Sequence, residues 1–344
     1  MDLGPNGASA CAAARWPSLL SLSISRNGLG DEGAAALARA SWPLLGTLVI
    51  RDNGISGRGA AALARAHFPG LCALDLDGNT IGQAGASALA AARWPRLAIL
   101  LLQSTGIGAN GAAALAAARF PTLLRLDFGS NGLGDAGAAA LAASVNFPKL
   151  RQLQLQDNQV GDAGAAALAA AGWPLLLLML SNNNVTPAGA AALAAAPFSR
   201  TLYFLALSNN IIGDDGIAAL AAGSSLRDIH TLLLSGAGIG PQGMAALATV
   251  PFRKLTILTL SCNNIGDEGA RRLALAPWRE LEQLDLHECG IGNEGAAALA
   301  LSVWPSLKAI TLHGNDIDKA CAAALVKADW PALEALELGS TVRA

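Results

Sequence analysis

Hydrophobic positions recur along this chain with a period of about 26 residues. Each period contains Leu-x-x-Leu-x-Leu, then an asparagine three residues later, then Ile-Gly-Asp-x-Gly-Ala-x-Ala-Leu-Ala or a close variant. The asparagine stands at Asn27, Asn53, Asn79, Asn131, Asn158, Asn183, Asn210, Asn263 and Asn315, and Thr105, Ala237 and Cys289 occupy the same phase. A period in this range is typical of a solenoid, in which each unit packs only on its neighbours.

Each period predicts a short strand followed by a turn. The last two aliphatic positions alternate, as in Leu48 and Ile50, which is the period of a strand with one buried face. Asparagine can both donate and accept hydrogen bonds in the turn, so we expect a ladder of asparagines between repeats. Thr105 and Cys289 are expected to substitute for it in part, and Ala237 is expected to be a weak point.

A helix is predicted after each turn. Aspartate or proline recurs at one phase, as at Asp31 and Pro187, and this phase is predicted to be the first helical position. Proline is favoured there, and aspartate there complements the helix dipole. We therefore expect helices of about ten residues, such as 31–40. One leucine per helix, from Leu37 to Leu325, is predicted to be buried, and a recurring glycine in the first turns indicates close approach of backbones.

A tryptophan or phenylalanine beside a proline closes each repeat, as in Trp42-Pro43. A stack that holds a cofactor or a carbohydrate is one interpretation, but the regular spacing favours core packing. The proline ends the helix and biases the chain toward extended structure. These aromatic rings are therefore predicted to be buried between repeats.

The predicted fold is α/β, a right-handed solenoid in the shape of a horseshoe. Parallel strands stack about 4.8 Å apart whereas helices need about 8–10 Å, so the sheet is expected on the concave face and the short helices on the convex face. No change of composition divides the chain, which predicts a single domain over residues 1–344 with about twelve 26-residue repeats and partial repeats at both ends.

The two ends carry no polar capping repeat. Residues 1–15 match a repeat helix without its strand, and the chain stops just after a strand that contains Leu336 and Leu338. Because solenoids normally have polar caps, we expect either a fragment of a longer protein or end-to-end self-association through the termini.

Composition narrows the function. The formal net charge is −2 and only 14% of the residues are charged, which argues against a nucleic-acid or acidic-membrane partner. The five cysteines are odd in number and form no Cys-x-x-Cys pair, so we expect no disulfide framework and a cytoplasmic location. No signal peptide is apparent, and Pro174 interrupts the one long uncharged stretch, residues 163–180, so no membrane span is expected.

The motif Leu-x-x-Leu-x-Leu-x-x-Asn-x-Ile-Gly-Asp-x-Gly-Ala-x-Ala-Leu-Ala resembles the ribonuclease-inhibitor-like class of leucine-rich repeats. It is also similar to proteins with Gly-Ala-Leu-Ala repeats. Proteins with this pattern include ribonuclease inhibitors, Ran GTPase-activating proteins, sensor regions of NOD-like receptors and bacterial effectors. The resemblance implies the binding of macromolecules.

The concave face is the predicted partner-binding surface, because its outward positions vary while the rest of the repeat does not. An acidic part, a central apolar part and a polar carboxy-terminal part are expected. The residues predicted to bind a partner are Arg51, Asp75, Asp77, Leu101, Asp127, Gln154, Leu177, Met179, Phe204, Leu233, Ile257, Asp285, His287 and His313. A contiguous exposed apolar patch often marks a partner site, so the central part is the favoured one.

Two histidines are the best candidates for chemistry. His287 and His313 share one phase of adjacent repeats, and with Asp285 or Glu288 they have the ligand types of a zinc or copper site. Because spacing fixes no third ligand, stacked surface histidines are favoured and no metal or cofactor is predicted. His67 and His230 stand at other phases and are expected to be surface residues.

No catalytic residues are predicted. Asp75 and Asp127 are two repeats apart, about 10 Å, which is long for a pair of glycosidase carboxylates. The predicted function is a non-enzymatic scaffold that binds a partner protein on its concave sheet. The alternative is a regulator of a small GTPase, similar to Ran GTPase-activating proteins, and a third hypothesis is a metal-dependent enzyme.

Overall fold

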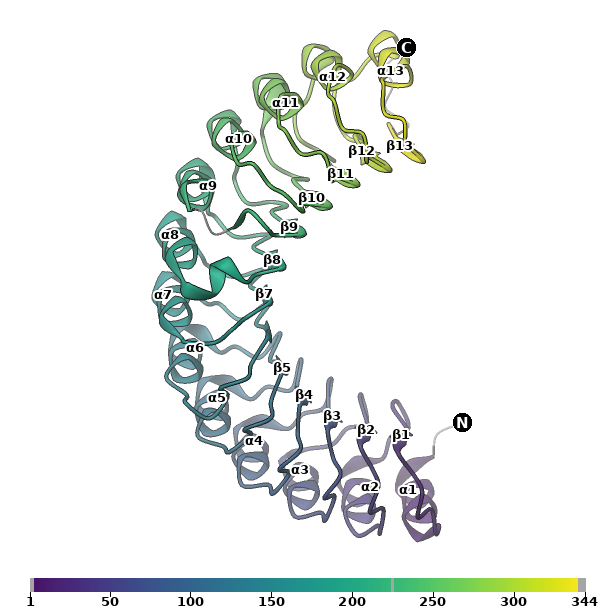
Figure 1. The fold of residues 1–344 in the computed structure, drawn as a ribbon. Helices are drawn as coiled ribbons and strands as arrows, with labels where there is room; N and C mark the ends of the chain where they lie inside the picture. Colours follow the sequence, from purple (N-terminus) through teal and green to yellow (C-terminus); the bar gives the residue numbers. More distant parts are fainter. Residues whose placement is uncertain (1–2, 224–225, 340–344) are drawn as a thin grey trace. The chain divides into compact units, whose positions relative to one another are not determined.

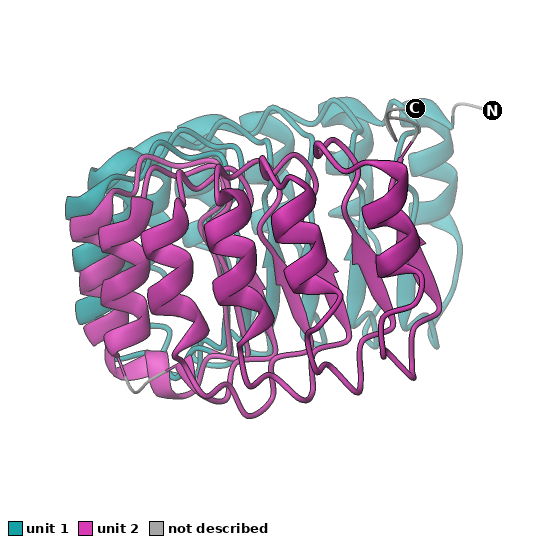
Figure 2. Ribbon diagram, turned by 90° about the horizontal axis from the view of Figure 1, so that it is seen from above, with its two compact units in different colours: residues 1–175 teal, residues 176–344 magenta. Residues whose placement is uncertain are grey.

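The computed structural model describes residues 3–223 and 226–339. The first two residues of the predicted amino-terminal partial repeat therefore lie outside the described part. The chain forms two compact units, residues 1–175 and residues 176–344, which are coloured separately in Figure 2. The single domain expected over residues 1–344 stays a prediction.

Strands and helices alternate along the first unit (Figure 1). Its elements are α1 (Gly4–Ala13), β1 (Ser21–Ser23), α2 (Gly30–Leu37), β2 (Thr47–Val49), α3 (Gly57–Ala64), β3 (Ala73–Asp75), α4 (Gly82–Ala90), β4 (Ile99–Leu101), α5 (Gly108–Ala116), β5 (Arg125–Asp127), α6 (Gly134–Ala142), β6 (Gln152–Gln154) and α7 (Asp162–Ala170). Strands β1 to β6 pair in parallel and in sequence order.

The second unit repeats this arrangement, with one additional 3-10 helix. Its elements are β7 (Leu177–Met179), α8 (Pro187–Ala195), η1 (Pro197–Arg200), β8 (Phe204–Ala206), α9 (Gly213–Ala222), β9 (Thr231–Leu233), α10 (Pro241–Ala248), β10 (Ile257–Thr259), α11 (Gly266–Ala274), β11 (Gln283–Asp285), α12 (Asn293–Leu299), β12 (Ala309–Thr311), α13 (Lys319–Leu325) and β13 (Ala335–Glu337). Strands β7 to β13 also pair in parallel and in sequence order.

Within each unit the strands line one side and the helices the other, with the sheet on the inner side of the curve (Figure 1). The predicted α/β solenoid of parallel strands and outer helices is therefore confirmed. Each strand residue lies opposite the equivalent residue of the next repeat, so that Leu48 lies opposite Leu74. No helix among the residues that the structure describes is long and apolar enough to cross a membrane.

The core contains the two columns that the sequence predicts. The helix leucine is buried in every repeat, at Leu37, Leu63, Leu89, Leu115, Leu141, Leu168, Leu193, Leu220, Leu247, Leu273, Leu299 and Leu325. The aromatic rings also pack on one another, with the Trp42 and Phe68 centroids 6.2 Å apart. Trp42 is buried whereas Trp16, the first ring of the column, is 40% exposed. Core packing of the aromatic column is confirmed.

Glycines allow the helices to approach each other, as predicted. A Cβ added at Gly85 would lie 3.0 Å from the Gly57 Cα and 3.1 Å from the Ala60 Cβ of the preceding repeat. These separations are shorter than ordinary contacts between carbon atoms, so a side chain at this position would push α3 and α4 apart.

The helices end earlier than expected. Helix α2 covers Gly30–Leu37, not residues 31–40, and the described helices are 7 to 10 residues long. At the end of α2 the amides of Arg39 and Ala40 donate hydrogen bonds to the carbonyls three residues earlier in the chain. This tighter winding ends the α-helix before the chain turns toward Trp42-Pro43.

The first-turn aspartates act mainly on the next repeat. One carboxylate oxygen of Asp31 accepts hydrogen bonds from the amides of Ser56 (2.8 Å) and Gly59 (2.9 Å), at the start of α3. Asp267 accepts from Gly292 (2.7 Å) and Gly295 (2.8 Å) in the same way. The expectation that these aspartates serve their own helix was thus incomplete, because the carboxylate also satisfies free amides at the start of the following one.

The asparagine ladder is confirmed. The Asn53 amide donates to Asn79 Oδ1 at 3.0 Å, and the side chain of Asn79 donates back to the Ile50 carbonyl at 3.0 Å. Thr105 keeps one such contact, from its hydroxyl to the Leu102 carbonyl (2.6 Å). Ala237 has no polar side-chain atom, although its own amide donates to Asn263 Oδ1 (3.0 Å).

Candidate partner-binding surface

Each three-residue strand presents its first and third side chains on the open face of the sheet, and strands β1 to β12 bury the second. In β7 the middle residue Leu178 is buried, while Leu177 and Met179 are half-buried. The predicted surface residues therefore lie on the sheet face, either within the strands or, for Arg51, Asp77, His287 and His313, two residues after them.

An ion-pair cluster occupies this face in the first unit. Arg51 Nε contacts Asp75 Oδ2, and Arg51 Nη2 lies 3.5 Å from Asp77 Oδ2. A shallow depression of about 490 Å³ lies beside the cluster, and its lining residues are Ser25, Arg26, Arg51, Asp52, Asp77, Gly78, Gln103 and Ser104. The two carboxylates outnumber the one guanidinium, so when both are ionised the cluster has a net charge of −1.

Two of the predicted aspartates also accept hydrogen bonds from the backbone of the turns that follow them. Asp75 and Asp127 are buried, and each accepts the amide two residues later, that of Asp77 (3.2 Å) or Gly129 (3.0 Å). Burial raises the pKa of Asp127, and the amide of Gly129 opposes that rise. Burial likewise raises the pKa of Asp77 to about 6, assisted by the nearby Asp75 and Asp127 carboxylates. A partner in contact with this region therefore meets mainly Arg51 and the edge of Asp77.

The other two predicted residues of the first unit differ in accessibility. Leu101, the last residue of β4, is buried. Gln154, at the end of β6, is half-buried and accepts a hydrogen bond from Arg125 Nε at 3.1 Å. Leu101 therefore offers little area to a partner in this conformation.

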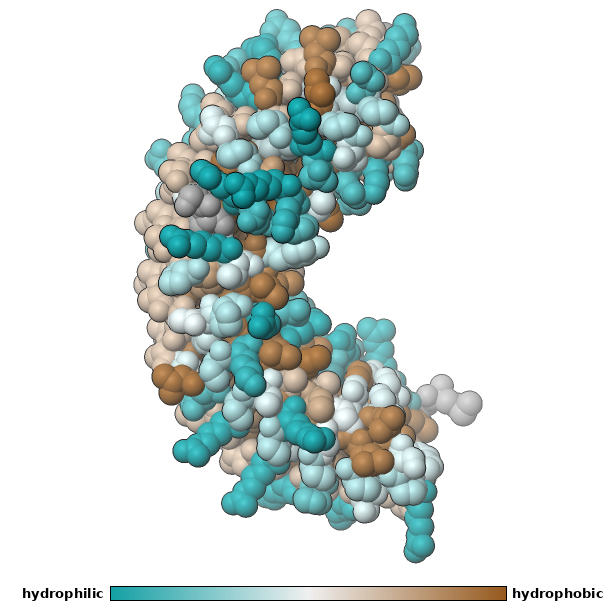
Figure 3. All heavy atoms as spheres, in the orientation of Figure 1, coloured by the Kyte–Doolittle hydropathy of each residue, from teal (hydrophilic) through white to brown (hydrophobic). Residues whose placement is uncertain are grey.

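Apolar side chains form a strip across β7 to β10 of the second unit. We call Leu177, Met179, Phe204, Leu233 and Ile257 the apolar strip; all five are half-buried. Leu177 lies opposite Phe204 on the neighbouring strand, while Ala206 links Met179 to Leu233. On the face seen in Figure 3, hydrophobic residues form separate clusters among hydrophilic ones, so apolar character alone does not single out a site. The strand register brings these residues together, with the buried Thr231 between Phe204 and Ile257.

Hydroxyl groups line one side of the strip. Ser261 donates to the Ser235 hydroxyl at 2.8 Å, and Ser235 donates to Thr259 Oγ1 at 3.0 Å. These residues carry no charge, and neither do the first and third residues of β7 to β10. The surface is therefore apolar with a neutral polar border on this side, whereas Asp285 lies opposite Thr259 at the β11 end.

The predicted histidine pair is present at the carboxyl ends of β11 and β12. The His287 and His313 ring centroids are 3.8 Å apart at an angle of 34°, which confirms that the rings are neighbours. Asp285 accepts the His287 amide at 3.0 Å. Both rings border a depression of about 240 Å³ that also includes Ile257 of the apolar strip.

One residue near the histidines was missed in the sequence. Cys262 lies in the turn after β10, and its thiol is 3.8 Å from Glu288 Oε2. Burial and the nearby Glu288 carboxylate raise the pKa of this thiol. The signal was available, because Cys262 and Glu288 are 26 residues apart and so share a phase of the repeat.

The remaining histidines have no common site. His67 is exposed, as expected. His230 is half-buried and stacks on Tyr203 with the ring centroids 4.0 Å apart.

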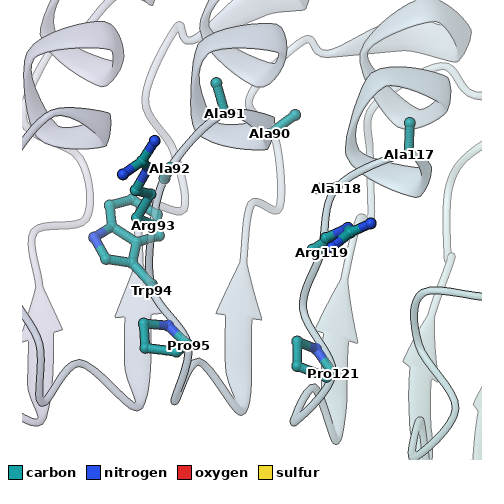
Figure 4. A pocket seen from close by; sticks show the side chains of 10 residues that line it. All are labelled: Ala90, Ala91, Ala92, Arg93, Trp94, Pro95, Ala117, Ala118, Arg119 and Pro121. Carbon is teal, nitrogen blue, oxygen red and sulfur yellow. The ribbon is translucent and has the colours of Figure 1, made fainter.

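Another depression, of about 540 Å³, lies where α4 and α5 end (Figure 4). Its lining is Ala90, Ala91, Ala92, Arg93, Trp94, Pro95, Ala117, Ala118, Arg119 and Pro121. Alanine side chains end at Cβ, which leaves this space between successive repeats. Its polar side-chain groups come from arginine and tryptophan, which do not make an acid–base pair or a metal site.

Comparison with known proteins agrees with this architecture. A family model described as Leucine Rich repeat matches just over half of the chain, at residues 17–38, 43–64, 71–90, 121–142, 148–169, 198–221, 253–274 and 280–300. No curated protein matches the sequence.

Solved structures also agree with this architecture. The chain is similar to an internalin (inlF) from Listeria monocytogenes, with a TM-score of 0.61 and 20% identity, over 98% of this chain and 95% of that one. It is also similar to a chain of the Rad7 and Elc1 complex in yeast, with a TM-score of 0.55 and 18% identity, over 90% of this chain and 83% of that one. At these identities the similarity shows the fold.

Proposed function

This chain belongs to the leucine-rich-repeat family, and from that premise we propose that it is a binding module whose apolar strip contacts a partner protein. Leucine-rich repeats commonly mediate protein–protein interaction, and members of the family are typically non-enzymatic. The observation that carries the proposal is the unbroken register from Leu177 to Ile257 across β7 to β10.

The chemistry of the strip defines the partner surface. Removing apolar area from water contributes about 25 cal/mol per Å², part of which is offset by the entropy lost on association. Met and Phe are enriched at the centres of interfaces, where charged residues are depleted. A charged partner group would lose its water here and meet only the hydroxyls of Ser235, Thr259 and Ser261, so it would bind weakly. The partner is therefore a protein with an uncharged apolar surface.

The rest of the predicted surface is secondary in this proposal. In the first unit, Arg51 and Asp77 are expected to influence the rate of association more than its strength, because their charges are largely compensated within the cluster. In the second unit, Asp285, His287 and His313 border the strip at its β11 end.

Replacement of three strip residues tests the proposal. A partner is first captured with the full chain and identified by mass spectrometry, and its dissociation constant is then measured for the Met179→Ala/Phe204→Ala/Leu233→Ala variant. Central interface residues contribute about 1–2 kcal/mol or more each, so we expect at least a tenfold weaker complex. Circular dichroism checks that the variant remains folded.

A matched control removes apolar residues elsewhere in the second unit. Leu275, Leu301 and Val303 are 79%, 84% and 78% exposed. The Leu275→Ala/Leu301→Ala/Val303→Ala variant is expected to bind normally. Equal affinity of the strip variant and the unmodified chain would exclude the strip as the binding surface.

Regulation of a small GTPase is the alternative prediction from the sequence. It requires that catalytic amounts of this chain accelerate GTP hydrolysis by the captured partner. A partner that is not a GTPase, or one whose hydrolysis rate is unchanged, excludes this alternative. The ribonuclease-inhibitor-like subclass, the similarity to Gly-Ala-Leu-Ala proteins and the cytoplasmic location stay predictions.

A further inference from the structure

Three side chains with metal-binding atoms converge in consecutive turns of the second unit. The ligand atoms of Cys262, His287 and Glu288 all lie within 4.8 Å of one another. His287 Nε2 is 3.5 Å from Glu288 Oε1, and Cys262 Sγ is 3.8 Å from Glu288 Oε2. Thiolate, imidazole and carboxylate are the three ligand types that zinc uses in proteins.

These separations suit a tetrahedral ion. With metal–ligand distances of about 2.0–2.3 Å, tetrahedral angles place neighbouring ligand atoms about 3.3–3.6 Å apart. The separations from His287 Nε2 to Glu288 Oε1 and from Cys262 Sγ to Glu288 Oε2 are close to this range, but they end on different oxygens of one carboxylate, and all three ligand atoms lie within 4.8 Å. Coordination of one ion therefore requires the side-chain torsions to change so that the three ligand atoms draw closer. Cys262 and Glu288 are exposed, which leaves them free to make these changes.

The histidine has the orientation that coordination requires. His287 Nδ1 lies 3.1 Å from the backbone carbonyl oxygen of His313. A carbonyl oxygen can only accept, so Nδ1 carries a proton in this contact, and in the neutral imidazole the lone pair is then on Nε2. Nε2 is also the nitrogen that faces Glu288. Metal-binding histidines usually donate their other N–H to a carbonyl or carboxylate in this manner.

The backbone holds the three turns together. The Cys262 amide donates to the His287 carbonyl at 2.8 Å, and the Glu288 amide donates to the His313 carbonyl at 3.0 Å. Gly314 provides the space, because a Cβ there would lie 2.6 Å from Glu288 Cγ and 3.2 Å from His287 Nδ1. The repeat itself thus positions the ligands.

We propose that Cys262, His287 and Glu288 bind one zinc ion, with water in the fourth position. This departs from the sequence-based prediction of no metal, and it differs from the histidine pair considered there. His313 contributes a backbone carbonyl and a ring that packs on His287, not a ligand atom. The inference does not depend on the binding of a partner protein.

Cobalt and zinc titrations of the full chain test the site. The protein is reduced, freed of metal with a chelator and titrated with Co²⁺, whose thiolate bond and tetrahedral geometry give characteristic absorption bands. We expect one equivalent to bind with both signatures, and one equivalent of Zn²⁺ to displace it. Cys262→Ser, His287→Ala and Glu288→Gln are each expected to weaken zinc binding at least tenfold.

Two control variants make the result specific. Cys72→Ser removes another exposed cysteine and is expected to leave binding unchanged. His313→Ala keeps the carbonyl that orients His287, so we expect less than a tenfold loss. The proposal is overturned if Co²⁺ shows no thiolate band, if Cys262→Ser binds normally, or if His313→Ala abolishes binding while Cys262→Ser does not.

Discussion

The asparagine ladder makes a strong prediction at Asn79, which lies in the turn after β3 and is fully buried. Its Oδ1 accepts hydrogen bonds from the amides of Asn53 and Ile55, both at 3.0 Å. Its Nδ2 donates to the carbonyls of Ile50 (3.0 Å) and Leu76 (2.8 Å). Asn79→Ala removes all four of these bonds at once.

The expected loss of stability follows mainly from the backbone amides of Asn53 and Ile55, which lose their acceptor. A buried donor that loses its partner costs about 1–3 kcal/mol, and an ordinary hydrogen bond contributes about 0.5–1.5 kcal/mol net. The Leu76 carbonyl loses less, because it also accepts the backbone amide at position 79, whereas the Ile50 carbonyl loses the Asn79 side chain as its donor. We therefore expect the free energy of unfolding to fall by about 3–5 kcal/mol.

Urea denaturation, followed by circular dichroism and tryptophan fluorescence, measures this loss. Asn110→Ala is the matched control, because Asn110 is exposed and donates from its side chain only to Gln83 at 3.3 Å; we expect a change within about 0.5 kcal/mol. Asn79→Thr is expected to fall between the two, because a threonine hydroxyl keeps one donated bond, as at Thr105. A loss below about 1 kcal/mol for Asn79→Ala would refute the reasoning.

Two further predictions concern Ala237 and Asp77. Ala237→Asn restores the missing asparagine of the ladder and offers Oδ1 to the amides of Asn210 and Ile212. We therefore expect the free energy of unfolding to rise by about 1–2 kcal/mol in the same urea assay. Destabilisation would mean that the turn cannot hold the larger side chain. Asp77 has its pKa raised from 3.8 to about 6, so the folded chain retains a proton that the unfolded chain releases between these values. The contribution of Asp77 to stability is therefore present at low pH and falls as the pH rises through this window. Asp77→Asn is expected to flatten the curve of unfolding free energy against pH in the same window. An unchanged curve would contradict the raised pKa of Asp77.

Repetition explains why so many contacts were predictable. A side chain in a solenoid meets its counterpart one period later, so position in the repeat is enough to pair Asn53 with Asn79 or Trp42 with Phe68. The same reasoning placed His287 beside His313. Predictions failed where the contact joins different phases, as between Asp31 and Gly59, since periodicity does not relate these positions to each other.

Periodicity was therefore sufficient for the strands, the outer helices, the buried leucines and the close approach at the glycines. The folded chain was needed for the helix ends, the bridging aspartates and the approach of His287 to Cys262 and Glu288, which share a phase with each other but not with His287. Cys262 and Glu288 have positive backbone φ angles of 57° and 50°, which few residues adopt and which redirect their side chains relative to the strands. Such backbone and side-chain torsions are decided by the turns that pack above and below, so only the assembled repeats bring the thiol, the imidazole and the carboxylate together.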